Sequence, residues 1–411
     1  MSYSIIQLEV TQPLPNIQTS ADETGVALVI RCQDRPIGFI MQELSPNSLL
    51  NPEDLQEMLS REMAENLLKA KIQEDLSQKS KFMEFPSLTV AMCTKDRPDN
   101  VARCLNSLQN LKKPDNLGYF EILIIDNAPS DDQTQKLVST FPDVRYVREL
   151  NVGLDFARNR AIKEAKGDIL AFLDDDIVVD TQWLLGLIEA WTENPDAGAF
   201  TGMVLPFELE TPAQILFERR GGFGRGFKKI RYGQVLDKNP LYPCGAGIFG
   251  AGCNMAFKRA LLLELGGFDE ALDTGSPLPG GGDLDIFYRV IRAGYPLIYE
   301  PSYLIYHQHR REMKKLRRQY WSWGLGFMAF VVKSYQNDPS QQGKFIALIK
   351  WWFQEQCLQL LKSLLGRQIL PPEMILAELW GGIQGLFGSY ERSQQRSAKI
   401  RQSTTDYSLP V

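Results

Sequence analysis

Residues 168–177 decide the fold, and they run Asp168-Ile169-Leu170-Ala171-Phe172-Leu173-Asp174-Asp175-Asp176-Ile177. The apolar run from Ile169 to Leu173 predicts a short buried strand, and three carboxylates follow where that strand would end. In open α/β sheets, ligands gather beyond the carboxyl ends of the strands. Adjacent anions repel one another unless a cation neutralises them, and aspartate oxygens suit Mg²⁺ or Mn²⁺. The stretch therefore predicts a metal-assisted phosphate site at one sheet edge.

Composition limits the classes of protein that the chain can belong to. Its 411 residues are 44% hydrophobic and 23% charged, which predicts a globular protein of two or three packed units. A net charge of −5 gives no reason to expect nucleic acid as a partner. The six cysteines lack C-x-x-C spacing, so we expect buried thiols in a reducing compartment, without disulfides or a zinc site.

The chain ends and the hydropathy pattern give an expected location. The first eleven residues lack a basic start followed by an apolar core, so we do not expect a signal peptide. No apolar run reaches the length of about 18 residues that a membrane-spanning helix needs. We therefore expect a cytoplasmic protein, and a position at the cytoplasmic face of the membrane stays open.

A strand-helix rhythm begins at Leu88. Strands are expected at 88–93, 122–125, 144–147 and 169–173, with amphipathic helices between them. Ser130 and Gln133 are spaced as a capping box for one of these helices. Such alternation predicts a doubly wound, mostly parallel α/β sheet. Because Asp96, Asp126 and the aspartate triplet all follow expected strands, they predict a nucleotide crevice along one edge.

Further downstream, two short segments also carry chemistry. Gly280-Gly281-Gly282 precedes Asp283 at an expected helix start, where the backbone can approach a ligand or Asp283 can simply cap the helix. The only two histidines, His307 and His309, follow an expected strand. Their position after two aspartate clusters favours metal binding over plain packing. A glycine-rich loop at 221–227 is compatible with a flap over substrate or with a surface loop.

The two ends of the chain predict accessory units. Residues 1–85 predict a small α+β module with a hairpin at 26–30 and 37–41, a helix after Asn51 and a linker at 71–81. Residues 312–411 predict a helical extension. At its start, basic residues precede aromatic ones, which suits an anionic membrane surface or a lipid-phosphate acceptor, and equally a solvated face on a core helix. The basic residues are Arg310, Arg311, Lys314, Lys315, Arg317 and Arg318.

The ordered motifs between Pro86 and Arg311 resemble the family 2 glycosyltransferases, which have the GT-A fold. This resemblance implies a catalytic domain at 86–311 between the two accessory units. The motifs are Cys93-Thr94-Lys95-Asp96-Arg97-Pro98, Ile125-Asp126-Asn127, Asn151-Val152-Gly153 through Ala157-Arg158-Asn159, Asp174-Asp175-Asp176, Gly282-Asp283-Leu284-Asp285, and Tyr299-Glu300-Pro301 through His307.

The same resemblance implies roles for individual residues. Asp176 and His307 match metal ligands, and Asp283 matches the general base of an inverting enzyme. Many family members have Glu-Asp where this chain has Gly282-Asp283, which leaves one candidate base instead of two. The expected nucleotide-sugar contacts are Thr94, Asp96, Arg97, Asp126, Gly153, Arg158, Asp174 and Asp175, with Asp126 placed to accept a hydrogen bond from a uracil-type base.

The resemblance implies metal-assisted, inverting transfer from a nucleotide-diphosphate sugar, with a UDP-sugar favoured, to a glycan or lipid-linked hydroxyl in polysaccharide biosynthesis. A Mn²⁺ or Mg²⁺ ion stabilises the departing diphosphate in such chemistry, and a carboxylate removes the acceptor proton. Two alternatives stay open. A nucleotidyltransferase would carry a glycine-rich phosphate loop after its first strand, where this chain has Thr94 to Pro98 without glycine. A catalytically silent scaffold in polysaccharide assembly would not need Asp176, Asp283 and His307.

Overall fold

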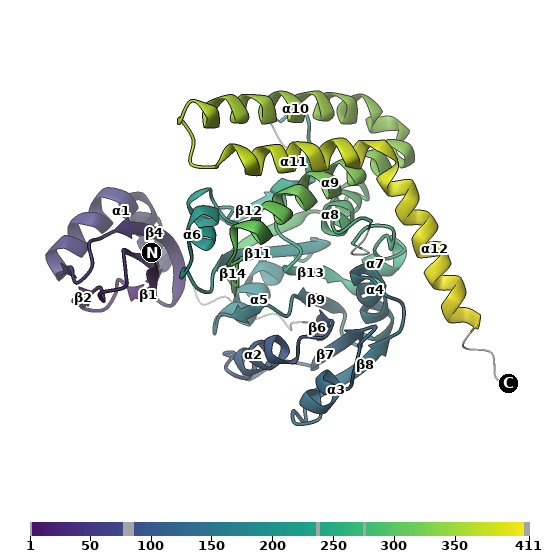
Figure 1. Ribbon diagram of the computed structural model, residues 1–411. Coiled ribbons are helices and arrows are strands. Elements are labelled where there is room, and N and C mark those ends of the chain that lie inside the picture. Colours follow the sequence, from purple (N-terminus) through teal and green to yellow (C-terminus); the bar gives the residue numbers. More distant parts are fainter. Residues whose placement is uncertain (1, 77–85, 236–238, 274–276, 407–411) are drawn as a thin grey trace.

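A computed structural model describes residues 2–76, 86–235, 239–273 and 277–406. Its centre is a nine-stranded sheet in the order β10-β14-β11-β13-β9-β6-β7-β8, with β12 paired to β14 (Figure 1). The strands are β6 (Leu88–Thr94), β7 (Phe120–Asn127), β8 (Val144–Glu149), β9 (Ile169–Leu173), β10 (Ile177–Val179), β11 (Ala199–Pro206), β12 (Ile230–Tyr232), β13 (Asn254–Lys258) and β14 (Leu297–His307).

Strand direction divides this sheet into a parallel half and a mixed half. Strands β9, β6, β7 and β8 are all parallel, as expected from the strand-helix rhythm. Strand β13 is antiparallel to both β9 and β11, while β11 and β14 are parallel to each other. Strands β10 and β12 pair antiparallel with β14. The predicted α/β class with a mostly parallel sheet is confirmed.

Alternating side chains give the sheet two buried faces. On β9, Ile169, Ala171 and Leu173 join one core, whereas Leu170 and Phe172 join the other. Because both faces are buried, the strand is apolar throughout. Helices α2 and α5 cover the first face, and α4, α7 and α8 cover the second. The helices of this region are α2 (Pro98–Gln109), α3 (Gln133–Val138), α4 (Leu154–Glu164), α5 (Trp183–Glu193), α6 (Pro212–Arg219), α7 (Arg259–Glu264) and α8 (Gly282–Arg292).

The N-terminal residues form a separate small sheet with its own core. The expected hairpin is present as β3 and β4, but the sequence analysis missed β1, which is parallel to β3. Arg31 joins this sheet to the central one through an ion pair with Asp180 and a 2.8 Å hydrogen bond to the Tyr306 hydroxyl. The elements are β1 (Tyr3–Glu9), β2 (Ile17–Gln18), β3 (Gly25–Cys32), β4 (Arg35–Glu43), β5 (Leu49–Leu50) and α1 (Pro52–Leu76).

Three local expectations differ from the structure, and part of one falls on residues that the structure does not describe. Helix α1 continues to Leu76, so the first half of the expected linker is helical, and residues 77–85 lie outside the described residues. The capping box at Ser130 is wrong, because Ser130 hydrogen-bonds Asp96 and the helix begins after Asp132 without a side-chain cap. Cys357 is exposed, although no disulfide joins any of the six cysteines, all of which are described.

The C-terminal helices cover one end of the central sheet (Figure 1). Tyr320 and Phe330, which follow the basic cluster, are buried, whereas Trp323 is 37% exposed, so α9 is a core helix with a solvated basic start. None of the helices in residues 2–406, outside the undescribed gaps, combines the length and apolarity that crossing a bilayer requires. The helices are α9 (Met313–Asn337), α10 (Gln342–Leu364), α11 (Pro372–Gln384) and α12 (Tyr390–Asp406).

Glycines let α9 and α11 pack backbone against backbone. A Cβ atom on Gly381 would lie 1.9 Å from the Trp321 carbonyl oxygen, and one on Gly324 would lie 2.0 Å from the Glu378 carbonyl oxygen. Atoms of the backbone cannot move aside as a flexible side chain can. The two helices can therefore keep this spacing only while these positions carry no side chain.

Replacing Gly381 with alanine should separate the two helices and lower the free energy of unfolding by about 1–3 kcal/mol, the usual range for an overpacked core. Gly343→Ala on α10 is the matched control, because nothing lies within 4 Å of its added Cβ. That control should raise stability by roughly 0.5–1 kcal/mol through the helix preference of alanine. Chemical unfolding measures both changes, and equal effects of the two variants would contradict the close helix packing.

Candidate functional site

The aspartate triplet connects β9 to β10 and meets the end of β6. The Thr94 hydroxyl donates a 2.7 Å hydrogen bond to Oδ2 of Asp175, and Nη1 of Arg97 lies 3.0 Å from Oδ1 of the same carboxylate. Burial raises the pKa of Asp175, while Arg97 and Thr94 act against that rise. Both carboxylate oxygens of Asp175 are therefore bound by side chains of the protein, whereas Asp174 and Asp176 remain available for other contacts.

Asp176 faces His307 across the β10–β14 pair. Register places Ile177 opposite His307, and Nε2 of His307 lies 3.3 Å from Oδ1 of Asp176. Burial raises the pKa of the Asp176 carboxyl, but His307, Arg310 and Arg97 outweigh it and hold the pKa below its usual range. Burial and the charge of Asp176 raise the pKa of Asp174 to about 6. Arg97, which follows β6, and Arg310, which follows β14, thus partly offset the negative charge of the triplet.

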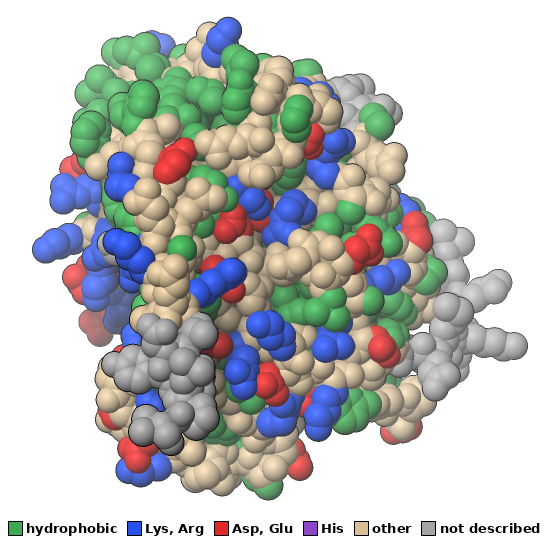
Figure 2. All heavy atoms as spheres, turned by 90° about the vertical axis from the view of Figure 1, so that its right-hand side faces the viewer, with side chains coloured by type: hydrophobic (Ala, Val, Ile, Leu, Met, Phe, Trp, Pro, Cys, Tyr) green, Lys and Arg blue, Asp and Glu red, His purple; other side chains and the backbone are tan. Residues whose placement is uncertain are grey.

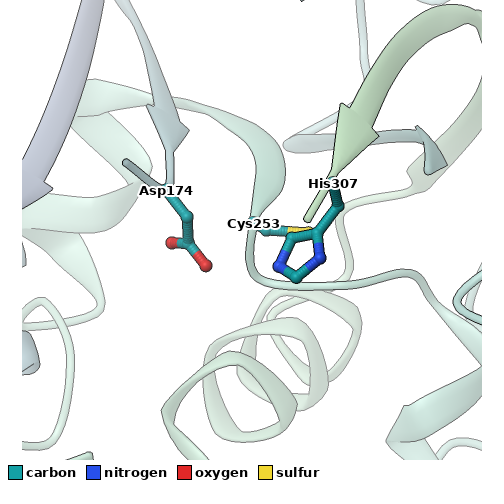
Figure 3. A group of neighbouring side chains, drawn as sticks. All are labelled: Asp174, Cys253 and His307. Carbon is teal, nitrogen blue, oxygen red and sulfur yellow. The ribbon is translucent and has the colours of Figure 1, made fainter. Parts of the chain in front are cut away.

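Asp174, Cys253 and His307 point toward one another (Figure 3). One ligand atom from each, a carboxylate oxygen, the sulfur and a ring nitrogen, lie within 4.8 Å of one another. Burial, with the charges of Asp174, Asp176 and Asp283, raises the pKa of the Cys253 thiol well above its usual value, so the sulfur is a weak ligand. The carboxylate and imidazole donors suit Mn²⁺, and Asp176 adds a further carboxylate beside His307. The donor set therefore fits the expected divalent ion.

Asp283 lies at the start of α8, beside the loop that carries Cys253. The backbone N–H of Gly252 donates a 3.1 Å hydrogen bond to Oδ2 of Asp283, and Leu284 donates one of 2.9 Å to Oδ1. Gly281, with φ of 109°, turns the chain into the helix. Since Gly252 precedes Cys253, whose sulfur lies within 4.8 Å of ligand atoms of Asp174 and His307, Asp283 lies near these candidate metal ligands.

Arg158 forms ion pairs close to the start of α8, the helix that carries Asp283. Its Nη1 lies 2.9 Å from Oδ1 of Asp155 and 3.3 Å from Oδ2 of Asp273. The Gly282 N–H donates a 3.0 Å hydrogen bond to the same Asp273 oxygen. Burial raises the pKa of Asp155 well above its usual value, and Oδ2 of Asp155 has no hydrogen-bond partner among the described residues. Nη1 of Arg158 is thus paired with two carboxylates inside the protein, and its contact with α8 is indirect.

Asp126 at the end of β7 offers an unpaired acceptor. The Tyr146 hydroxyl donates a 2.8 Å hydrogen bond to its Oδ2, while its buried Oδ1 has no partner within the part of the chain described. Burial raises the pKa of Asp126, and the bond from Tyr146 offsets part of that rise. Asp96 differs, because the backbone N–H and the hydroxyl of Ser130 occupy its two oxygens at 2.7 Å each.

Gly153 begins α4 beside the same sheet edge. Its N–H donates a 2.9 Å hydrogen bond to Oδ1 of Asn127, and its φ of 143° is a conformation that side chains rarely adopt. The structure therefore brings most of the expected site residues to one edge of the sheet, with Asp96 and Arg158 committed to internal contacts.

The two histidines form a chain of contacts that leads from the triplet to α6. Nδ1 of His307 lies 3.3 Å from Nδ1 of His309, and Nε2 of His309 lies 3.0 Å from Oε2 of Glu218. Burial lowers the pKa of His309, and Glu218 acts against that change. Phe223, from the glycine-rich loop, packs with its ring centre 5.2 Å from that of His307. This loop is therefore part of the site's wall and more than a plain surface loop.

A cavity of about 230 Å³ adjoins this wall. Trp323 lines it, and the Trp323 ring centre is 5.9 Å from that of Phe223. Residues of α6, α9, α10 and α11, with the segments beside them, supply the lining, which mixes aromatic rings with amides and charges. The lining residues are Phe217, Arg220, Gly222, Tyr320, Trp323, Glu355, Gln356, Gln359, Gln368, Leu370, Ile375 and Glu378.

Sequence reasoning missed several residues of this site. Cys253 was expected only as a buried thiol, and Asp155, Asp273 and Tyr146 drew no attention. The acidic Asp155 on the buried face of a helix was a detectable signal, because a charge is rarely buried there without a partner. Nothing in the local sequence marks Cys253 or Tyr146, since their roles depend on neighbours from distant segments.

Comparisons with known proteins show which sequences this chain is similar to. Residues 89–264 match the family model described as Glycosyl transferase family 2. A Drosophila melanogaster protein provisionally named polypeptide N-acetylgalactosaminyltransferase 10 is 27% identical over 71% of this chain and 46% of its own length. The glucosyl-dolichyl phosphate glucuronosyltransferase of Haloferax volcanii is 25% identical over 36% of this chain and 45% of its own.

A third relative is the pre-mycofactocin glycosyltransferase of Mycobacterium tuberculosis, 22% identical over 55% of this chain and 44% of its own length. The chain thus spans about half the length of these curated relatives. A solved mannosyltransferase from Pyrobaculum calidifontis, in complex with GDP-Man and Mn²⁺, covers 81% of this chain and 97% of its own at 16% identity. Its TM-score of 0.47 is too low for a conclusion about fold or function.

Glu378 in the cavity should make stability depend on pH. Burial raises its pKa to about 7, whereas an unfolded glutamate titrates near 4.3. The folded chain holds this proton more tightly, so its stability falls as pH rises between those two values, by up to about 3 kcal/mol. Thermal unfolding of Glu378→Gln should match the wild type below pH 4.3 and exceed it at pH 8.

The control for this titration is Glu373→Gln, an exposed carboxylate on the same helix. It should leave the pH dependence of the melting temperature unchanged. A Glu378→Gln variant with the same pH profile as the wild type would show that the cavity does not hold this carboxyl in its neutral form.

Proposed function

We propose that the protein moves a sugar from a nucleotide-diphosphate sugar to a hydroxyl acceptor with inversion, in line with the match of residues 89–264 to the family model of glycosyl transferase family 2. The observation that carries the proposal is the position of Asp283, hydrogen-bonded to Gly252, near the candidate ligands Asp174, Asp176 and His307. A base for the acceptor and ligands for the donor's diphosphate are both required by a one-step displacement, and they lie on either side of the Gly252–Cys253 turn.

The donor half of the cleft follows the ends of β6, β7 and β9. The unpaired Oδ1 of Asp126 suits a ring N–H of the base, which favours a uracil-type nucleotide. Arg97 is half-exposed while it pairs with Asp175, so it can also contact a phosphate. The turn at Gly153 allows the backbone to approach the nucleotide closely. We assign these residues, with Thr94 and Asp174, to the nucleotide sugar.

The chain's own residues account for the proton and the positions of the reacting groups. Asp283 accepts the proton of the acceptor hydroxyl as that oxygen bonds to the anomeric carbon. The bond from this carbon to the diphosphate oxygen breaks, and the nucleoside diphosphate leaves with the electron pair. Hydrogen bonds from Gly252 and Leu284 hold the Asp283 carboxylate in place. A Mn²⁺ or Mg²⁺ ion held by Asp174, Asp176 and His307 would neutralise charge on the leaving diphosphate.

The acceptor side is the cavity beyond Phe223. Aromatic rings stack on the apolar faces of sugars, while amides and carboxylates hydrogen-bond their hydroxyl groups. Trp323 and Tyr320 supply the rings, and Gln356 and Gln359 supply the amides. Oε1 of Gln368 is buried without a partner among the described residues, so a ligand hydroxyl would satisfy it. We propose that a glycan acceptor reaches the cleft through this cavity.

The two alternatives are weaker on physical grounds. A nucleotidyltransferase has no use for a carboxylate base opposite the metal ligands, where Asp283 is oriented by two backbone N–H groups. A silent scaffold would not need to bury three adjacent aspartates, since unpaired buried charges are costly to maintain. Both alternatives nevertheless make different predictions for a turnover measurement.

Incubation with candidate nucleotide sugars, Mn²⁺ and a glycan acceptor should release nucleoside diphosphate, with UDP-sugars the best donors. Asp283→Asn should lower kcat by about 10²–10⁴-fold, the usual contribution of a general base, with little change in donor affinity. Glu53→Gln, an exposed first-turn carboxylate on α1, is the control and should retain full turnover. A pyrophosphate product would indicate nucleotidyl transfer, and donor binding without any turnover would indicate a scaffold.

Asp176→Ala should weaken donor binding only when Mn²⁺ is present, because the variant removes an oxygen ligand and the partner of His307. A loss of roughly tenfold to a hundredfold in affinity is typical when a metal site loses a ligand or its support. Isothermal titration of UDP with and without Mn²⁺ measures the effect. Equal affinities of variant and wild type in Mn²⁺ would remove Asp176 from the metal site.

A further inference from the structure

Helices α10 and α11 expose a broad apolar face that we call the outer face. Hydrophobic side chains gather over the top of the molecule in Figure 2, where Figure 1 places these two helices. Two tryptophans belong to the face, with Trp351 49% and Trp380 57% exposed. The other members are Ile346, Leu358, Leu361, Leu364, Leu365, Ile369, Leu376, Ile383 and Phe387.

The outer face is distinct from the face by which the same helices pack on the protein. Phe345, Leu348 and Trp352 of α10 are buried, and the glycines of α11 pack against α9. Both helices are therefore apolar on two sides, one covered by the protein and one uncovered. Contiguous exposed patches of this kind are rare on monomeric proteins and mark contact with a partner or a membrane.

The charges around the outer face are mostly positive. Residues 342–387, all described, contain the basic residues Lys344, Lys350, Lys362 and Arg367 and three acidic ones. Two of those acids, Glu355 and Glu378, line the cavity on the protein side, which leaves Glu373 as the exposed acid of this segment. The surface that meets a partner is thus apolar with a surplus of cations.

More positive charge lies at one end of the outer face. Leu316 of α9 packs in one cluster with Leu370 and Met374, which belong to the turn between α10 and α11 and to the start of α11. The exposed residues beside Leu316, which include Arg317 and Arg318, therefore lie next to the end of α10 that carries Leu364 and Leu365. The basic start of α9 and the outer face are parts of one surface.

We propose that the outer face docks on the surface of an anionic lipid bilayer, with α10 and α11 lying in the plane of the membrane. Leucine and tryptophan side chains enter the boundary between headgroups and acyl chains, and the surrounding cations contact anionic headgroups. The helices do not cross the bilayer, in agreement with their hydropathy. This docking is separate from sugar transfer and would stand even if the proposed activity failed.

A second copy of the chain is a poorer occupant of the same face. In a two-fold symmetric dimer the same patch lies on both sides of the interface. Such a dimer would bring Lys350, Lys362 and Arg367 of both copies into one interface, with Glu373 as the opposing charge in this segment. An anionic surface satisfies these cations, whereas a self-association buries them against one another.

Vesicle flotation of the full chain tests the proposal without any activity measurement. The wild type should float with vesicles of phosphatidylcholine and phosphatidylglycerol in roughly equal amounts, and should bind vesicles of phosphatidylcholine alone at least tenfold more weakly. The double variant Leu361→Glu, Trp380→Glu should lose flotation. Leu68→Glu on α1 is the matched control, since Leu68 is 61% exposed and Leu361 is 59% exposed.

A charge variant and a mass measurement complete the test. Lys350→Glu, Lys362→Glu, Arg367→Glu, combined in one chain, should also lose flotation while its circular dichroism matches the wild type. A wild type that stays with the soluble fraction, or that binds neutral and anionic vesicles equally, overturns the proposal. So does a dimer in light scattering that Leu361→Glu, Trp380→Glu converts to a monomer, because the face is then a protein interface.

Discussion

The accumulation of negative charge at the end of β9 is the constraint on which the site depends. Three aspartates follow a fully buried strand, so their charges cannot be screened by bulk water as surface charges are. The charge of each aspartate is accommodated in a different way. Asp175 is bound by Thr94 and Arg97, Asp176 faces His307, and the pKa of Asp174 rises through burial and the neighbouring charge. The side chains that meet the triplet come from the end of β6, the loop after it and the end of β14, which the sheet order brings together.

Close backbone packing then places the proposed base opposite these aspartates. The turn before β13 donates the Gly252 N–H to Asp283, and the next residue, Cys253, lies against Asp174 and His307. The buried ion pair of Arg158 and Asp155 supports the start of α8, because Arg158 also pairs with Asp273, which accepts a hydrogen bond from the Gly282 N–H. A buried charge network of this kind contributes little net stability, but it allows few alternative arrangements. We interpret it as a support that fixes α8 relative to the metal-binding edge.

The accessory segments extend the site in different ways. The small N-terminal sheet contacts the central sheet through Arg31, which pairs with Asp180 directly after β10 and with Tyr306 of β14, the strand that ends at His307. The C-terminal helices line the cavity that we assign to the acceptor, and their opposite side forms the outer face. The same two helices would therefore position both the acceptor and the membrane surface, which suits an acceptor attached to a lipid.

The sequence by itself determined the parallel strands and the helices between them, because hydrophobic periodicity is a local property that survives without its neighbours. It also placed Asp174, Asp176 and Asp283 at the ends of elements, where ligands bind. The tertiary structure alone decided which side chains meet there. Cys253 lies directly before β13, a strand antiparallel to β9, and strand order is set by contacts between distant residues. Arg158 matched a nucleotide-binding pattern, yet burial forces its charge to pair with Asp155 and Asp273, and only the folded chain shows that pairing.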